Sequence, residues 1–455
     1  MVALREVLTP LKFKRLKLSK FTWITILIAA ILGISIATAG YYYYVLPQPT
    51  RLRILYIHPD PMVSEVVNDF KNRYGSPIEV TLTPTDPQSA YETITSPSER
   101  GKADILWGGP LSLYEEASDN LLPYDSKQKN EINTTLHSCP LMDPDSSAPR
   151  WYAASLHALG VMYNEYVLNA LNLSIPQTWA DLLKEGYEEN VTMVDPTESE
   201  FTQPFIMLQI QSKNWIRGWE YLVNMSAFVK DYDDTETYSV SKVASGYLSV
   251  AIVPDFYAYD KMAYGGYPVN FTYLNATVLQ PDPIAIVKSG KYLDEAKAFI
   301  DYILTPPAQT IIGQYHLPVH ENATVTPPRI KPFDQNFPYV PNYNGTFEEI
   351  GKEIVKDYYR VWITERHEQE PSIKTAWKEI KEANKTSPYY DLAWNNFTKA
   401  GCYTSRAEID TIYSVTNGWT KTDDVTSYYM DIWGKASEDA YKNAIYNAKE
   451  TKKQT

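Results

Sequence analysis

The chain has 455 residues, of which 44% are hydrophobic, with 42 lysines and arginines against 55 aspartates and glutamates. This length predicts two or three domains with a substantial core, and the hydrophobic content excludes a disordered chain. The net charge is −13, and residues 1–20 contribute +5 to it, so the rest of the chain carries −18. Such an acidic body repels a phosphate backbone, which argues against a nucleic-acid partner.

Residues 21–46 contain no charged side chain and are long enough to cross a bilayer as a helix. Six basic residues precede this segment, whereas only Arg51 and Arg53 follow closely, so the positive-inside rule places the leader 1–20 in the cytoplasm and the body outside the cell. A cleaved signal peptide is the alternative, since Ala37-Thr38-Ala39 precedes Gly40. We favour an uncleaved anchor in the lipid bilayer, because the apolar stretch continues beyond that point.

Ten Asn-x-Ser/Thr triplets without proline occur, all of them beyond residue 50. This number indicates an exported, extracellular glycoprotein; coincidence in a threonine-rich chain is the alternative. The acceptor residues are Asn133, Asn172, Asn190, Asn224, Asn270, Asn275, Asn322, Asn344, Asn384 and Asn396.

Cys139 and Cys402 are the only two cysteines. In an oxidising compartment an isolated pair is more often a disulfide than a metal site, which needs further ligands at short spacing. We therefore expect a disulfide between them, with two unpaired buried thiols as the alternative.

The middle of the chain alternates predicted strands and helices. Strands are expected at 52–57, 78–82 and 103–107, with helices at 63–74 and 91–99 between them. The same pattern returns with strands at 249–253 and 284–287 and a helix at 292–304. This alternation predicts an α/β fold with parallel strand pairing. A proline-rich connector follows residue 327, and helices are then expected at 347–363, 372–383 and within 389–449.

From residue 52 to about 320, seven segments resemble, in the same order, the extracellular solute-binding proteins of ABC importers, in particular the ferric-iron-binding group. One is Ala103-Asp104-Ile105-Leu106-Trp107-Gly108-Gly109 and another is Ile175-Pro176-Gln177-Thr178-Trp179-Ala180-Asp181-Leu182-Leu183. The others are 52–56, 159–164, 240–246, 281–288 and 295–304. With the predicted anchor, the resemblance suggests an archaeal, membrane-anchored member.

The resemblance implies a two-lobed periplasmic-binding-protein fold of type II that captures a small molecule or ion outside the cell. The captured solute is then delivered to an ABC transporter permease. The chain would build part of lobe 1 (47–155), complete lobe 2 (156–279), return to lobe 1 (280–330), and end in a helical extension (331–455). The segments 152–161 and 278–284 fit the two crossings between the lobes. The ligand would bind between the lobes, and hinge closure would bury it.

Several cleft candidates follow predicted strands of the first lobe. His58 and Asp60 follow the first strand; His58 is able to bind an anion or a metal, or the loop merely caps the next helix. Trp107 offers a stacking face, with a core tryptophan as the alternative, and Gly108 and Gly109 allow the backbone to approach a ligand.

A second group of candidates precedes the apolar helix expected from residue 205. Thr197, Ser199 and Thr202 correspond to the hydroxyl-rich segment with which the family holds an anion at a helix start. Glu198 and Glu200 depart from that pattern and weaken the case for an anionic ligand. Capping of the helix is the alternative role.

A third group aligns with the second half of the family pattern. Asp255 precedes Phe256 and Tyr257, where ferric-binding relatives place two adjacent tyrosines, and Asp282 lies at the second crossing. Because Phe256 replaces the first tyrosine, ferric iron held by Tyr257 or His58 is a minority hypothesis, and no cofactor is expected. An organic solute stacked on aromatic rings is at least as well supported.

Two other classes of function remain open. Paired carboxylates such as Glu198 and Glu200 are compatible with an exported carbohydrate-active enzyme. No nucleophile elbow, His-Glu-x-x-His signature or phosphate loop supports an enzyme. A structural surface glycoprotein with a degenerate cleft is the third hypothesis. We favour the solute-binding protein.

Overall fold

The computed structural model describes residues 27–35, 50–57, 60–75, 77–144, 148–264, 266–326, 329–341, 343, 345–402, 404–416 and 424–453. Residues 27–35 form a helix, and the rest of the leader and predicted anchor lies outside the described residues. Within the described residues, no helix combines the length and the apolar character needed to cross a membrane. Residues 51–75 and 80–455 form one compact unit, which contains the site.

The first lobe contains the parallel strands that the sequence predicts. Strand β1 pairs in parallel with β3, with Ile54 opposite Ile105 and Tyr56 opposite Trp107. The strands of this lobe are β1 (Thr50–Tyr56), β2 (Ile78–Pro84) and β3 (Ile105–Trp107), with the short hairpin β4 (Thr135–Leu136) and β5 (Cys139–Pro140). Its helices are α2 (Asp60–Arg73), α3 (Pro87–Thr95), α4 (Leu111–Glu116), α10 (Leu293–Ile303) and α11 (Pro306–Ile312), with 3-10 turns η1 (Pro97–Glu99), η2 (Ser118–Asn120) and η3 (Lys129–Glu131).

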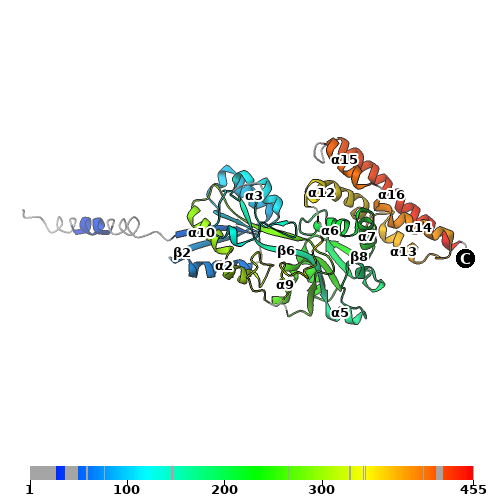
Figure 1. The fold of residues 1–455 in the computed structure, drawn as a ribbon, viewed down its shortest axis with the longest axis horizontal. Coiled ribbons are helices and arrows are strands. Elements are labelled where there is room, and N and C mark those ends of the chain that lie inside the picture. Colours follow the sequence, from blue (N-terminus) through cyan, green and yellow to red (C-terminus); the bar gives the residue numbers. More distant parts are fainter. Residues whose placement is uncertain are drawn as a thin grey trace, which may run out of the picture. The chain divides into compact units, whose positions relative to one another are not determined.

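Two antiparallel strands, β6 (Trp151–Asn164) and β11 (Leu279–Ile286), lie where the two lobes meet (Figure 1). All fourteen residues of β6 are buried. Its first half pairs with β11, and its second half pairs with β9 and β10 of the second lobe. The segments predicted to cross between lobes, 152–161 and 278–284, therefore lie in adjacent strands of one continuous sheet.

The second lobe repeats the α/β pattern around β7, which pairs in parallel with both β8 and β9. Its strands are β7 (Val191–Val194), β8 (Val229–Asp233), β9 (Val250–Pro254) and β10 (Val269–Thr272). Its helices are α5 (Glu165–Ala170), α6 (Pro204–Lys213), α7 (Trp215–Phe228), α8 (Glu236–Ala244) and α9 (Asp255–Tyr264), with 3-10 turns η4 (Trp179–Leu183) and η5 (Glu185–Tyr187). The two-lobed α/β fold is thus confirmed.

The carboxyl-terminal extension shares one hydrophobic core with the second lobe. Tyr358 and Trp362 belong to the same buried cluster as Phe205 and Trp219, and the rings of Tyr358 and Trp219 lie 4.9 Å apart, edge to face. Such buried aromatic contacts dominate core energetics. The extension, yellow to red in Figure 1, consists of α12 (Gly345–Tyr359), the π-helical turn η6 (Arg360–Thr364), α13 (Ile373–Lys381), α14 (Pro388–Thr398), the 3-10 turn η7 (Ala400–Cys402), α15 (Arg406–Thr416) and α16 (Asp424–Lys452).

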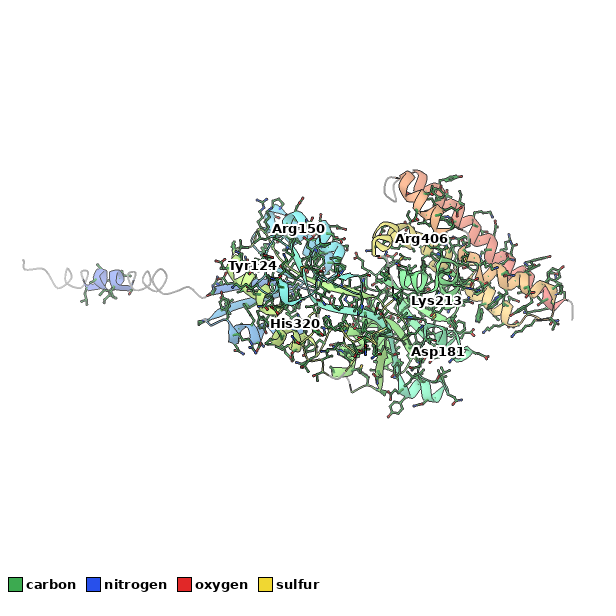
Figure 2. All side chains as sticks on the ribbon, viewed as in Figure 1. Tyr124, Arg150, Asp181, Lys213, His320 and Arg406 are labelled. Atoms are coloured by element: carbon green, nitrogen blue, oxygen red, sulfur yellow. The ribbon has the colours of Figure 1, made fainter. Side chains whose placement is uncertain are left out.

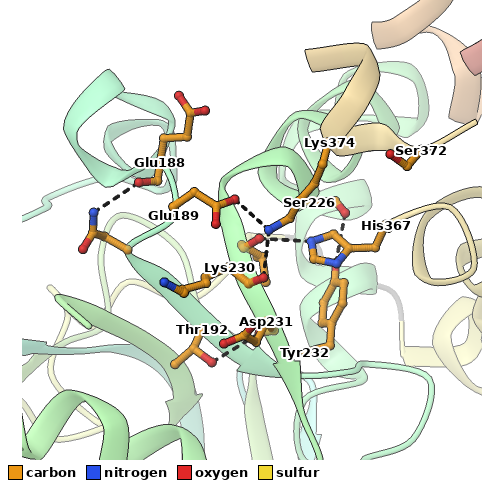
Figure 3. A network of polar contacts seen from close by, with 12 residues as sticks. Glu188, Glu189, Thr192, Ser226, Lys230, Asp231, Tyr232, His367, Ser372 and Lys374 are labelled. Atoms are coloured by element: carbon orange, nitrogen blue, oxygen red, sulfur yellow. Dashed lines mark hydrogen bonds and ion pairs between the residues drawn. The ribbon is translucent and has the colours of Figure 1, made fainter. Parts of the chain in front are cut away.

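Polar contacts reinforce this packing at β8, as Figure 3 shows. The Lys374 ammonium donates to the Glu189 carboxylate at 2.6 Å and to the Lys230 carbonyl at 2.8 Å. Nε2 of His367 lies 3.0 Å from the carbonyl oxygen of Val229, and its ring packs against Tyr232. The extension is therefore an integral part of the second lobe's fold.

The structure does not contain the predicted disulfide between Cys139 and Cys402. Cys139 lies in β5, a hairpin strand that contacts β11. Cys402 lies in η7, which packs on α7, and its Sγ donates to the carbonyl of Ile216. The two thiols sit in different layers of the fold, a separation that sequence spacing does not reveal.

Candidate functional site

A pocket of about 1090 Å³ lies between the two lobes. Both lobes, both crossing strands and the extension contribute to its walls. A volume of this size accommodates a small organic molecule. The polar and charged residues of its lining include Ser112, Glu115, His137, Asp143, Arg150, His157, Glu200, Gln203, Gln280, Lys352 and Glu353, and its aromatic residues are Tyr114, Trp151, Phe201 and Tyr343.

The two glycines after β3 make the turn that leads into this pocket. Gly108 and Gly109 have φ angles of +87° and +91°, which side-chain-bearing residues rarely adopt. A Cβ atom on Gly109 would lie 2.7 Å from Cδ1 of Ile57, so any larger residue would also clash. The backbone N–H of Gly108 donates to the carbonyl of Pro283 in β11 at 2.7 Å. The turn thereby directs the chain from β3 into α4, whose residues line the pocket.

Trp107 itself is fully buried in the core, where its ring packs against Phe299 at 5.8 Å. It does not line the pocket, so the structure places it in the alternative role of a core tryptophan. His58 and the side chain of Asp60 lie outside the described residues. Of the candidates near the first lobe's strand ends, the glycine turn is the one that adjoins the pocket.

The segment before α6 contributes a different set of residues from the one expected. The backbone N–H of Thr197 donates to Asp195, and the Ser199 hydroxyl donates to Glu236, so both candidates serve local structure. Thr202 is fully buried, and its hydroxyl has no hydrogen-bond partner among the described residues. The residues of this segment that line the pocket are Glu200, Phe201, Gln203 and Pro204.

Gln203 combines burial with an unused donor. It is 5% exposed and lines the pocket, and its side-chain amide Nε2 has no acceptor within the described part of the chain. A buried donor without an acceptor costs about 1–3 kcal/mol. A ligand oxygen in the pocket would supply that acceptor.

A buried polar cluster occupies the crossing strands behind the pocket. Asp282 of β11 accepts a hydrogen bond from the Ser155 hydroxyl at 3.0 Å and lies 3.0 Å from Nδ1 of His316. His157 of β6 pairs with the same carboxylate at 3.4 Å and contacts the side-chain oxygen of Gln280 at 3.1 Å. Asp282 thus organises the hinge strands, while His157 and Gln280 reach the pocket lining.

The environment of His157 favours its charged form. Burial by itself lowers the pKa of His157, but attraction to Asp282 and Asp255 outweighs burial and raises that pKa above 6.5. The rings of Phe201 and Phe256 pack edge-on against the imidazole at 5.6 and 5.5 Å. The imidazole, with its raised pKa, therefore lies among aromatic rings next to the pocket.

The surroundings of Asp255 and Tyr257 disfavour the charged forms of both side chains. Asp255 is fully buried and accepts a hydrogen bond from Tyr273 at 2.7 Å, and burial raises its pKa. Burial also raises the pKa of Tyr257, which disfavours the phenolate that Fe³⁺ requires. The described residues contain no group of three or more His, Cys, Asp or Glu side chains able to hold a metal ion.

Figure 2 places Arg150 in the first lobe and Lys213 in the second. Arg150 lines the pocket and makes a two-point contact with Asp143, at 2.6 and 3.2 Å. Lys213 lies at the end of α6, where its ammonium donates to Gln209 and burial lowers its pKa to about 8. Of Arg150 and Lys213, only Arg150 is therefore among the residues that line the pocket.

A profile described as "Bacterial extracellular solute-binding protein" matches residues 104–337, just over half of the chain. The chain belongs to this family. The matched region contains the glycine turn, both crossing strands and the second lobe.

The phosphoglycerate transport regulatory proteins PgtC of Salmonella typhimurium and Salmonella typhi are each 28% identical to the chain over 161 residues. This match covers 35% of the chain and 40% of the length of these curated relatives.

Solved structures share the fold. The periplasmic binding protein P5PA superposes with a TM-score of 0.55 at 21% identity, covering 69% of this chain and 99% of its own. AfuA from Actinobacillus pleuropneumoniae, with fructose-6-phosphate bound, gives 0.56 at 19% identity and covers 70% and 99%. Iron-bound HitA from Pseudomonas aeruginosa gives 0.53 at 16% identity and covers 68% and 98%. Because these structures span their whole length on about 70% of this chain, they establish the two-lobed fold.

Sequence reasoning missed most of the pocket lining. His157 and Gln280 lie in segments predicted to be crossings, and polar residues in such apolar strands were the available signal. Gln203 follows Glu198 and Glu200, the two glutamates that depart from the family pattern. Lys352 and Glu353 lie in the extension, beyond the family match, where no pattern pointed to a site.

Proposed function

We propose that the protein captures a small solute in the pocket between its lobes and delivers it to an ABC transporter permease. The observation that carries the proposal is the pocket itself, which both lobes and both crossing strands line in a member of a solute-binding family. Two lobes joined by adjacent strands can close around a ligand by hinge motion. Membership of a binding-protein family speaks against the alternative of an exported enzyme.

We propose an organic solute rather than ferric iron. The surroundings of Tyr257 support this choice, because burial and the nearby carboxylates of Glu236 and Asp282 raise its pKa and so disfavour a phenolate. The lining combines aromatic rings with amide, carboxylate and guanidinium groups, which suits a polar organic molecule. PgtC is named for phosphoglycerate transport and AfuA holds fructose-6-phosphate, so small phosphorylated compounds are the first candidates to test.

The location of the protein is also a proposal. The uncharged segment 21–46 and its basic leader support a single-pass membrane anchor, with the body outside the cell. Of the ten predicted glycosylation acceptors, the nine whose side chains the structure describes are all at least partly exposed, which supports attachment of glycans. Resistance of the native protein to carbonate extraction, and a mass decrease on chemical deglycosylation, are the expected results.

Binding is tested with the full chain by thermal-shift screening of phosphorylated sugars and acids, neutral sugars and ferric citrate, followed by isothermal titration of each hit. We expect at least one organic solute to raise the melting temperature and to be recovered unchanged. Chemical turnover of the hit would contradict a transport function. A response to ferric citrate alone would contradict the choice of an organic solute.

A further inference from the structure

We propose that the carboxyl-terminal extension forms one wall of the solute site and that its Lys352 determines specificity by pairing with an acidic group, a carboxylate or a phosphate, of the solute. This inference rests on the proposed solute-binding function. It assigns a role to a part of the chain that lies beyond the family match, which ends at residue 337.

The carboxyl-terminal extension lies beside the solute pocket. Tyr343, Lys352 and Glu353 line the same pocket as Gln203 and Phe201 of the second lobe. Helix α12 contacts α6, the helix that begins directly after Gln203. The extension therefore stands next to the segment before α6 that lines the same pocket.

Buried packing and polar contacts attach the extension to the second lobe. Ile354 and Tyr358, which follow Lys352 in α12, are fully buried in the core of the second lobe. The Thr364 hydroxyl donates to Asp195 at 3.1 Å, and Arg360 pairs with Glu198 at 3.5 Å. These contacts hold the extension that carries Lys352 against the segment before α6.

The Arg and Lys side chains of the pocket lining differ in their pairing, and the carboxylates of Glu115 and Glu200 line the same pocket. Arg150 is neutralised by Asp143, and Glu353 pairs with Lys356. Lys352 forms no ion pair within the part of the chain that the structure describes. Since an ammonium group carries three donors, an acidic ligand group would satisfy it.

Gln203 offers a bound solute an uncharged hydrogen-bond donor. The buried Nε2 of Gln203 is a donor without an acceptor among the described residues, and Gln203 lines the pocket. One ligand bearing several acceptor oxygens would satisfy Gln203 and Lys352 without leaving a buried polar group unpaired. A carboxylate or a phosphate has such oxygens and also carries the negative charge that favours pairing with an ammonium group.

Glu198 and Glu200, which depart from the family pattern, both have partners within the protein. Glu198 pairs with Arg360 of the extension, and Glu200 accepts a hydrogen bond from Ser112. Both carboxylates are thus engaged by protein groups. They do not rule out an acidic ligand group beside Lys352.

The test compares the full-length protein with the K352Q, K352R and K442Q variants. Lys442 is an exposed lysine of α16 in the same extension and serves as the matched control. Isothermal titration uses glycerol 3-phosphate, glycerate, inorganic phosphate and neutral glycerol as probes, at two salt concentrations. Circular dichroism melting verifies that each variant is folded, and K352R shows whether the charge alone restores binding.

We expect the wild type and K442Q to bind an acidic probe alike, and K352Q to bind it about tenfold to hundredfold more weakly, the range of a charge-assisted hydrogen bond. K352R should recover most of the affinity, and K352Q should show a smaller salt dependence. Inorganic phosphate and glycerate distinguish the two acidic groups. Equal binding by K352Q would overturn the role of Lys352 and leave the proposed function intact. If the wild type binds only neutral compounds, the role of Lys352 is likewise overturned; if it binds nothing in either screen, the proposed function fails as well.

Discussion

The hydroxyl of Ser112 in α4 donates a hydrogen bond to the carboxylate of Glu200 at 2.6 Å and so links the first lobe directly to the second. Both residues line the pocket. Glu200 is exposed and Ser112 is half-buried, so the bond lies at the edge of the pocket. A contact of this kind favours the closed arrangement of the lobes without fixing it permanently.

We predict that S112A shifts the lobes towards an open arrangement. Loss of a partly solvated hydrogen bond to a carboxylate costs about 0.5–1.5 kcal/mol, which corresponds to about a two- to tenfold change in the ratio of closed to open molecules. Small-angle scattering should show a larger radius of gyration than in the wild type. The control is S241A, because the Ser241 hydroxyl bonds only to a carbonyl of its own helix. An unchanged radius in S112A would show that other contacts close the lobes.

The shared core predicts that the extension and the second lobe unfold together. Tyr358 is fully buried between Trp219 of α7 and Trp433 of α16, each 4.9 Å from its ring. Replacement of such a ring by alanine should cost about 3–5 kcal/mol. Calorimetry of Y358A should show one transition for both parts at a lower temperature. Y428A, at a position that is 61% exposed, should change stability little. Separate melting of the extension would contradict a shared core.

The raised pKa of His157 predicts a stability change near neutral pH. Because the folded pKa lies above the unfolded value of 6.5, the stabilisation is fully present below pH 6.5 and is lost as the pH rises through the folded pKa. The melting temperature of the wild type should therefore fall more steeply than that of H157Q above pH 6.5. D282N, which removes the main attractive charge, should flatten the profile in the same way. Parallel profiles for all three proteins would refute this assignment.

The lack of a disulfide between Cys139 and Cys402 predicts how the two thiols react. Burial raises the pKa of Cys402 to about 11, and Cys139 is 3% exposed, so both thiols should react slowly with a disulfide reagent at pH 8 in the folded protein. Two equivalents should react after denaturation without a reductant. Recovery of a peptide linking Cys139 to Cys402 by mass spectrometry would show instead that the pair is oxidised.

The helices and strands, and their order along the chain, could be predicted from the amino-acid sequence. Alternating apolar patterns located β1 and β3, and the change in composition after residue 327 located the helices of the extension. These features are local, because side-chain periodicity within a few residues determines them. The turn at Gly108 and Gly109 was also predictable, since positive φ angles favour glycine.

Which residues line the pocket could not be predicted from the sequence, because it depends on how distant segments pack together. Trp107 became a core residue because its strand is covered by Phe299, far away in the sequence, and Cys139 and Cys402 were left apart by packing in different layers. The pocket brings together Arg150, Gln203 and Lys352 from three separate regions of the chain. No local pattern encodes such a meeting, because it depends on long-range contacts between the lobes, the hinge strands and the extension.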